Sequence, residues 1–376
     1  MKMKQLYFLI TILLFTACGQ KEKLTVISAD DFVYNHNNKD IRLYTLENEN
    51  GLICQLTNFG ARVVSIYTPD KNGEFGDIVV GYGTGKEFVE KKENFFGTTI
   101  GRYGNRIGNA VFSIDSVEYQ LEKNDGENHL HGGGNGFHRQ VWEVENVDNS
   151  SIVFSYVSPD MEGGYPGTVS VKVKYQLTES NELKIEYFAS SDKNTILNLT
   201  NHTYFNLKDA GSSEINNHLL YINADLYTPV DAGLIPTGEL ATVKGTPFDF
   251  REETAIGERV SASNEQLELG KGYDHNWVLN TGNDVAIVAA KVIEPESGRV
   301  MEVYTKEPGL QFYGGNFLDG TDIGKNNISY GHRSAFCLET QHFPDSPNKA
   351  DFPSVVLNSG EEYYSICIYK FKTVND

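Results

Sequence analysis

Apolar and polar residues alternate along several stretches of this chain, and this pattern is typical of a half-buried β-strand. The clearest case is Val169–Leu177, where every second residue is apolar and the residues between are polar or charged. Asn181-Glu182 and Ser297-Gly298 lie between such stretches and predict hairpin turns. Less regular alternation predicts further strands at Ser151–Ser158, Leu183–Ser190, Asp284–Glu294, Arg299–Lys306 and Tyr363–Phe371.

Helical periodicity is almost absent from the chain. Thr254–Val260 is the one segment that predicts a turn or two of helix. Strands do not alternate with helices along the chain, so a parallel sheet is not expected. The 36 glycines, 21 tyrosines and 21 phenylalanines also favour strands joined by turns. No change of composition divides the chain, so we expect one all-β domain over residues 36–376, a large antiparallel β-sandwich.

The N-terminus predicts an export signal. Lys2 and Lys4 precede the apolar run Leu6–Ala17, which is too short to span a bilayer and ends at Cys18. The segment around Cys18 resembles a bacterial lipobox, and the alternative is an ordinary secretory signal cleaved nearby. We therefore expect a signal peptide at 1–17, lipidation of Cys18 and a tether at 18–35. The expected location is the bacterial cell envelope, periplasmic or outer-membrane associated, with the lipid anchor as the membrane contact.

The charge and the cysteines narrow the classes of partner. The formal net charge is −19, and removal of residues 1–17, which hold two lysines and no acidic residue, changes it to −21. Such acidity argues against nucleic acid as a partner and makes an anionic substrate less favoured.

The remaining Cys54, Cys337 and Cys367 are odd in number and widely spaced, which does not predict a disulfide framework.

Two ionisable residues interrupt apolar, strand-like segments. His202 lies within Leu197–Leu207, and Glu339 ends the apolar run that begins at Ala335. Burying either group is costly unless it is paired, hydrogen-bonded or functional. A satisfied core histidine and a structural salt bridge are the alternative explanations.

A second cluster combines histidines, glycines and arginines. His129 and His131 are two residues apart, and on a strand this spacing would place both rings on one face as half of a metal site. The other ligands of such a site are not evident, and Gly132–Gly134 favours a tight loop against a ligand. Arg102 and Arg106 lie in another Gly-rich segment, where guanidinium groups would suit sugar hydroxyls or anions.

Taken together, these motifs resemble the galactose mutarotase (aldose 1-epimerase) family, in the family's order and from about residue 40 to the C-terminus. The resemblance implies a galactose mutarotase-like supersandwich with its site in a cleft on the sheet. The matching segments are Gly101–Ile107, Asn128–Gly133, Gly164–Gly167, Asn201–Leu207, Asp231–Glu239, Tyr273–Asn276, Gly309–Tyr313 and Leu338–Asp345.

The resemblance also implies residue roles. His202 would be the general acid and Glu339 the general base of the reaction, while His129 and His138 would be structural. No metal or redox cofactor is required, although the acidity leaves a structural cation such as calcium open. The implied sugar-binding residues are Asn105, Arg106, His131, Tyr204, Asp274 and Gln311.

The implied function is interconversion of the α and β anomers of free hexoses such as D-galactose and D-glucose, by acid–base opening and closure of the ring. One alternative is a non-catalytic carbohydrate-binding surface lipoprotein, for which an acid–base pair would have no purpose. The other is a glycoside-processing enzyme, which would use two carboxylates around the sugar and for which Asp274 could supply the second.

Overall fold

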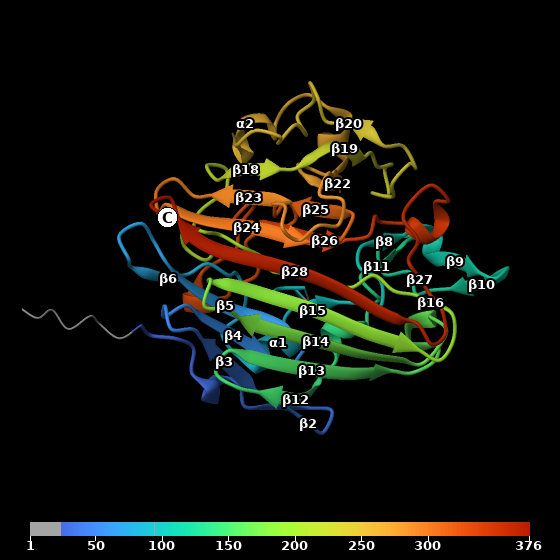
Figure 1. Ribbon diagram of the computed structural model, residues 1–376, viewed down its shortest axis with the longest axis horizontal. Helices are drawn as coiled ribbons and strands as arrows, with labels where there is room; N and C mark the ends of the chain where they lie inside the picture. The colour runs from blue at the N-terminus through green and yellow to red at the C-terminus, as the bar shows by residue number, and fades with distance from the viewer. Residues whose placement is uncertain (1–23, 94) are drawn as a thin grey trace, which may run out of the picture.

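The computed structural model describes residues 24–93 and 95–376, so the expected signal peptide and Cys18 lie outside the described residues. Its largest element is a nine-stranded antiparallel sheet that runs across the front of Figure 1. In spatial order its strands are β12 (Glu143–Val147), β13 (Ser151–Ser158), β14 (Val169–Leu177), β15 (Glu182–Ser191), β28 (Glu362–Thr373), β24 (Arg299–Thr305), β23 (Ala290–Ile293), β18 (Leu219–Ile222) and β21 (Thr254–Ala255).

Two smaller antiparallel sheets complete the main framework. One has the order β20 (Ala241–Thr242), β19 (Ala224–Thr228), β22 (Asp274–Leu279), β25 (Gly309–Tyr313) and β26 (Cys337–Gln341). The other has the order β3 (Leu43–Glu47), β4 (Ile53–Thr57), β5 (Arg62–Pro69) and β6 (Phe75–Asp77).

Short strand pairs and helices fill the connections. The pairs are β1 (Tyr34–His36) with β2 (Lys39–Ile41), β7 (Thr99–Ile100) with β17 (Thr200–Asn201), β8 (Arg106–Ile107) with β11 (His129–Leu130), β9 (Val111–Ile114) with β10 (Val117–Gln120), and β16 (Thr195–Ile196) with β27 (Val356–Leu357). The α-helices are α1 (Gly85–Glu90), α2 (Ile256–Arg259) and α3 (Glu265–Leu269). Among the described residues, no helix is long and apolar enough to cross a membrane.

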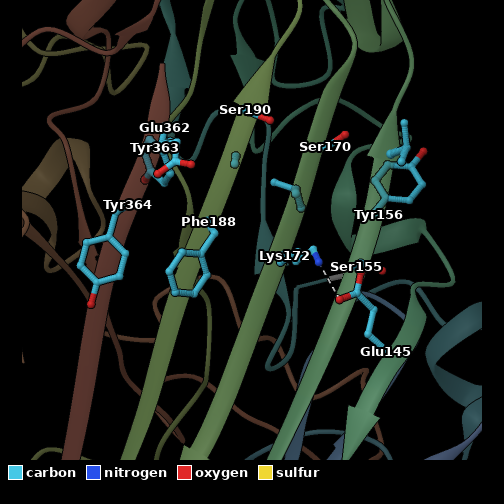
Figure 2. A pocket seen from close by; sticks show the side chains of 13 residues that line it. Glu145, Ser155, Tyr156, Ser170, Lys172, Phe188, Ser190, Glu362, Tyr363 and Tyr364 are labelled. Carbon is cyan, nitrogen blue, oxygen red and sulfur yellow. Dashed lines mark hydrogen bonds and ion pairs between the residues drawn. The ribbon is translucent and has the colours of Figure 1, made fainter. Parts of the chain in front are cut away.

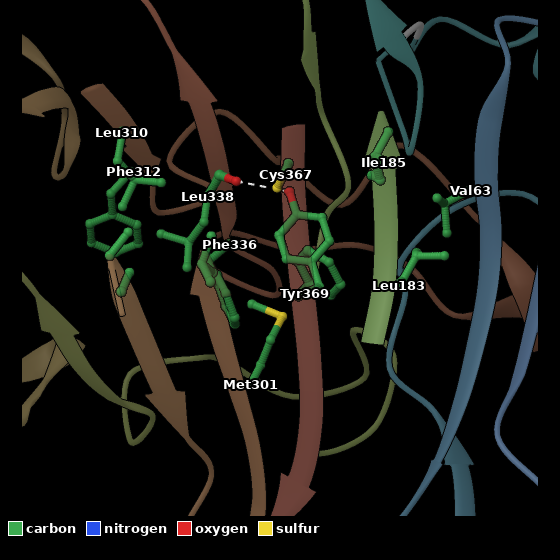
Figure 3. Close-up of a cluster of buried hydrophobic side chains, with 14 of the residues drawn as sticks. Val63, Leu183, Ile185, Met301, Leu310, Phe312, Phe336, Leu338, Cys367 and Tyr369 are labelled. Atoms are coloured by element: carbon green, nitrogen blue, oxygen red, sulfur yellow. Dashed lines mark hydrogen bonds between the residues drawn. The ribbon is translucent and has the colours of Figure 1, made fainter. Parts of the chain in front are cut away.

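The three large sheets share one hydrophobic core. Figure 3 shows Ile185 of β15 and Tyr369 of β28 from the nine-stranded sheet in the same cluster as Phe312 of β25, Leu338 of β26 and Val63 of β5. The Tyr369 hydroxyl also donates a hydrogen bond of 3.0 Å to the Leu338 carbonyl across this layer. Inward-facing side chains of opposing sheets therefore pack face to face, which confirms the predicted all-β sandwich.

The opposite face of the nine-stranded sheet carries the polar members of the alternating pattern. Figure 2 shows Lys172 on this face in an ion pair with Glu145, 2.7 Å between Nζ and Oε2. Phe188 and Tyr364 are exceptions, since their rings contact each other at 5.3 Å between centroids while remaining about 40% exposed. The alternation in Val169–Leu177 thus corresponds to one core face and one outer face, as the sequence predicts.

Most of the predicted strands and both hairpin turns are present, but two boundaries are wrong. The strand predicted at Asp284–Glu294 begins at Ala290, because Gly282 and Asn283 have positive φ and Asp284 accepts the Ala286 N–H within a turn. The predicted tether also ends too late. Ile27 and Gln55 exchange hydrogen bonds of 2.9 and 3.2 Å, and Phe32 is fully buried, so this part of the segment packs against the domain.

Candidate active site

Three strands of the five-stranded sheet supply one wall of a buried polar site. Gln311 of β25 is the cross-strand partner of Glu339 in β26, and Asp274 of β22 pairs with Tyr313 two residues further along β25. Because alternate side chains of a strand point to opposite faces, the residues between them face the core instead. The Gln311 amide donates a hydrogen bond of 2.7 Å to Asp274 Oδ1, which joins two of these strands at the site.

His202 enters the site from the segment that follows β17. Its backbone N–H donates to the Thr98 carbonyl at 2.9 Å, and its carbonyl accepts the Gly97 N–H at 3.0 Å. Its ring stacks on Tyr204, with centroids 4.9 Å apart and planes 22° apart. The Nε2 atom lies 3.5 Å from Oε1 of Glu339, so an imidazole and a carboxyl group face each other inside the protein.

The β8–β11 pair positions a second histidine and an arginine. Leu130 is the register partner of Arg106, and His131 follows directly with a φ of 52°. The next residue, Gly132, also has a positive φ, and a Cβ there would lie 2.0 Å from the Gly101 carbonyl oxygen. The loop therefore requires glycine at this position. The ring of His131 comes within 5.1 Å of the His202 ring, measured between centroids.

These side chains line a pocket of about 190 Å³. This volume is below the roughly 300–1,000 Å³ of pockets for drug-sized ligands. The predicted residues in its lining are Asn105, Arg106, His131, His202, Tyr204, Asp274 and Glu339, and Gln311 is buried beside Asp274. The lining also contains Glu93, Phe95, Leu130, Tyr313 and Phe317.

Burial sets the protonation of the facing pair. It lowers the pKa of His202 to about 3, because a buried imidazolium loses its hydration. Burial also raises the pKa of Glu339 well above its ordinary value, the charge of Asp274 raises it further, and Arg106 opposes both effects. Burial therefore favours the uncharged form of both partners, a neutral imidazole facing a protonated carboxyl group.

Several polar atoms at the site have no protein partner. Glu339 Oε2, Gln311 Oε1 and His202 Nδ1 are buried without a hydrogen bond among the described residues. Buried polar groups in folded proteins are usually satisfied, so this arrangement favours a ligand with several hydroxyl groups.

Another candidate from the sequence, Arg102, has a structural role, and so do several aromatic residues near the site motifs. Arg102 points away from the pocket and donates hydrogen bonds to Ser158 Oγ and to the carbonyls of Pro159 and Pro166. The aromatic residues Phe205, Trp277 and Phe312, which share the apolar segments of the motifs, are fully buried in the core.

The His-x-His spacing does not form a metal half-site. His129 is held by the Glu122 carbonyl at Nδ1 and by the Tyr165 hydroxyl at Nε2, both at 2.7 Å. A different group, His131, His202 and Glu339, offers three ligand atoms within 4.8 Å of one another. Two histidines and a carboxylate are a donor set that Zn²⁺ accepts, so these three residues are the ones that could hold a cation here.

The fold and this pocket define an all-β sandwich protein with a buried histidine–carboxyl pair in a polar pocket. A family model described as aldose 1-epimerase matches residues 42–370. The galactose mutarotase of Homo sapiens is 43% identical over 320 residues, covering 85% of this chain and 91% of that protein. The aldose 1-epimerase of Escherichia coli K12 is 39% identical over 332 residues, covering 88% and 95%.

Solved structures agree with the sequence comparisons. An aldose epimerase homologue from C. elegans superposes with a TM-score of 0.82 at 33% identity, covering 89% of this chain and 99% of that one. A galactose 1-epimerase from Lactobacillus acidophilus gives a TM-score of 0.79 at 30% identity, covering 90% and 97%. The chain belongs to the aldose 1-epimerase family.

The hydrogen bonds of the two neighbouring histidines predict opposite tautomers. The Asn105 N–H donates to His131 Nδ1 at 3.0 Å, so the proton of this neutral ring is on Nε2, toward the pocket. In His129 the Glu122 carbonyl can only accept, so the proton is on Nδ1. We expect long-range ¹H–¹⁵N NMR spectra at pH 6.5 to show one ring of each kind, both neutral, because burial lowers the pKa of both.

The assignment of each signal would come from the variants His131→Gln and His129→Gln. A proton on Nδ1 of His131, or a charged His131 ring at this pH, would contradict the geometry.

Proposed function

We propose that this protein is an aldose 1-epimerase that interconverts the α and β anomers of free hexoses such as D-galactose and D-glucose. The observation that carries the proposal is the contact of 3.5 Å between His202 Nε2 and Glu339 Oε1 inside a small polar pocket. Ring opening needs proton transfer at O1 and at the ring oxygen, and both oxygens are bonded to C1. An acid and a base that serve them must therefore lie within a few ångströms of each other.

In the proposed reaction Glu339 is the general base and His202 the general acid. The carboxylate takes the proton from the hydroxyl on C1 as the C1–O5 bond breaks and the C1 carbonyl forms. The imidazolium gives its proton to O5, which becomes the free hydroxyl on C5. Rotation about the C1–C2 bond then presents the other face of the aldehyde, and the two proton transfers reverse as the ring closes. Acid and base catalysis of this kind each contribute about 10²–10⁴-fold.

The pair needs a single proton throughout this cycle. When the sugar ring is closed, the proton is on His202 and Glu339 is a charged carboxylate. When the sugar is the open aldehyde, the proton is on Glu339 and His202 is neutral. Burial favours the second, uncharged arrangement. The desolvated pocket therefore favours the protonation state that accompanies the open chain.

The remaining lining residues would bind the sugar. His131 directs an Nε2–H into the pocket, Arg106 presents its guanidinium, and Asp274 and Gln311 offer acceptors for hydroxyl protons. The apolar face of a pyranose suits the rings of Tyr204 and Tyr313. These contacts hold the reacting carbon against the acid–base pair.

The reaction as proposed requires no metal or redox cofactor. A cation bound by His131, His202 and Glu339 would occupy the atoms that carry the proton, so metal binding there would inhibit. We also propose that the protein is exported and anchored through a lipid on Cys18. The basic start, the apolar run and the lipobox-like segment at residues 1–18 support this location.

The function is tested by polarimetry on freshly dissolved α-D-galactose and α-D-glucose, with protein lacking residues 1–18 and dialysed against EDTA. We expect the wild type to accelerate the approach to the unchanged final rotation. Glu339→Gln and His202→Asn remove the proton transfer of each side chain with little change in its size, so each should reduce kcat by about 10²–10⁴-fold. Glu118→Gln, at an exposed carboxylate of β10 outside the pocket lining, serves as the matched control and should retain full activity.

A wild type that is no faster than buffer on any free aldose would overturn the proposal. Retained activity in either active-site variant would overturn that residue's role.

The pH dependence follows from the depressed pKa of His202. Activity requires one proton on the pair, and it is lost when acid adds a second proton to His202. Because burial lowers the pKa of that imidazole to about 3, the acid limb should lie well below the ordinary histidine value of about 6.5. Measurement of kcat/KM for galactose from pH 4 to 9, after subtraction of the buffer rate, checks this. An acid limb at 6.5 or above would show that the empty site does not hold His202 neutral.

The anchor is tested in the full-length protein expressed in a bacterial host. We expect the wild type to sediment with membranes and to release a diacylglyceryl-modified N-terminal peptide in mass spectrometry. Cys18→Ser should lose both properties while keeping its mutarotase activity, because Cys18 lies far in sequence from the site residues. A membrane fraction unchanged by this substitution would argue against lipidation at Cys18.

A further inference from the structure

Two carboxylates contact the guanidinium of Arg106, and they differ in distance and in exposure. Its Nε donates to Asp125 Oδ2 at 2.7 Å, while its Nη1 lies 3.9 Å from Asp274 Oδ2. The Arg106 side chain is 10% exposed and that of Asp274 is 9% exposed, whereas Asp125 is 36% exposed. Asp125 therefore binds the arginine from outside the pocket, and Asp274 meets it from within.

The backbone fixes the Asp125 carboxylate in this place. Asp125 and Asn128 exchange two backbone hydrogen bonds of 3.0 and 3.1 Å across a tight turn. The Asn128 side chain accepts the Asn109 N–H at 3.0 Å, which ties this turn to the segment that follows β8. Two residues beyond the turn, Leu130 pairs with Arg106 itself. The arginine of β8 and the aspartate in the turn before β11 are thus held together by this strand pairing.

We propose that Asp125 is a positioning residue for Arg106, and that its charge makes the pocket select uncharged aldoses over anionic sugars. This inference rests on the proposed mutarotase function. With Nε engaged by Asp125, the guanidinium plane is oriented so that its Nη1 group faces Asp274 and the pocket. A planar guanidinium has few orientations once Nε and one edge are occupied, so the loss of one partner releases it.

The selection follows from the balance of charge. A single arginine in a small pocket would attract a sugar carboxylate or phosphate, but here two carboxylates flank it. The charge of Asp125 reaches into the site. Burial raises the pKa of Asp274, Arg106 lowers it, and the charge of Asp125 raises it again. Two like charges about 8 Å apart near a protein surface repel each other strongly enough to weaken binding by roughly a factor of ten or more, before salt screening. An anionic substrate is therefore repelled where a neutral hexose is not.

The test compares D-galactose with D-galacturonate, which replaces the C6 hydroxymethyl group by a carboxylate and keeps the ring stereochemistry. Rates of mutarotation are measured by polarimetry for the wild type, Asp125→Asn and Asp125→Ala. The asparagine variant would keep an acceptor for Nε but remove the charge, and the alanine variant would remove both. Glu127→Gln is the matched control, because Glu127 is a neighbouring carboxylate that is 79% exposed and pairs with Lys123 away from the pocket.

We expect both Asp125 variants to raise the ratio of kcat/KM for galacturonate to that for galactose by about five- to tenfold. For galactose alone, Asp125→Asn should stay within about threefold of the wild type, whereas Asp125→Ala should lose about tenfold, mainly through KM. Glu127→Gln should change neither quantity. Thermal unfolding of each variant separates these effects from loss of the folded state.

Two outcomes would overturn the inference. If the ratio is unchanged in both variants of an active enzyme, Asp125 does not select against anions. If Asp125→Ala and Glu127→Gln have the same kcat/KM for galactose, Asp125 does not position Arg106. Both results leave the proposed function intact, whereas a wild type that is inactive on every free aldose would overturn the function and this inference together.

Discussion

The antiparallel register of β22, β25 and β26 is the constraint on which the site depends. Gln311 and Glu339 face each other across two strands, and Leu310, Phe312 and Leu338 between and beside them face the core. A slip of one residue would exchange these two sets, placing a carboxyl group in the apolar layer. The same hydrophobic packing that stabilises the sandwich therefore also orients the Glu339 carboxyl group, so one strand register determines both the stability of the fold and the geometry of the site.

Packing on the nine-stranded sheet explains why the site residues are so deeply buried. The core behind β25 and β26 is continuous from β5 to β28, so the strands that carry Gln311 and Glu339 have no solvent on their rear face. In front, Phe95 contacts the rings of His131 and His202 at 4.9 and 5.8 Å between centroids. Desolvation from both sides is the largest cause of the opposed pKa shifts of His202 and Glu339, and it favours the uncharged form of each group.

Sequence alone was sufficient for the framework and for the residues inside motifs. The period-two pattern of Val169–Leu177 reports which side chains face the core, because that information is local. His202 and Glu339 could be found because an ionisable group in an apolar run conflicts with its surroundings. The prediction of a strand at Asp284–Glu294 was wrong in its first half, because Asp284 accepts the backbone N–H groups of Ala286 and Ile287 within a turn. Residues contributed by loops could not be predicted in the same way. The contact between Asp125 and Arg106 depends on the pairing of β8 with β11. This pairing is a tertiary contact that cannot be predicted from the sequence of either segment alone.

The acidity of the chain and the chemistry of its pocket are consistent with each other. A net charge of −19 would hinder the approach of an anion at any distance within the screening length, but it has no effect on an uncharged hexose. At the pocket, Asp274 from within and Asp125 from outside flank the one arginine. Arg106 can then serve as a directional donor to sugar oxygens rather than as an anchor for negative charge, which is the use of a guanidinium that a neutral substrate requires.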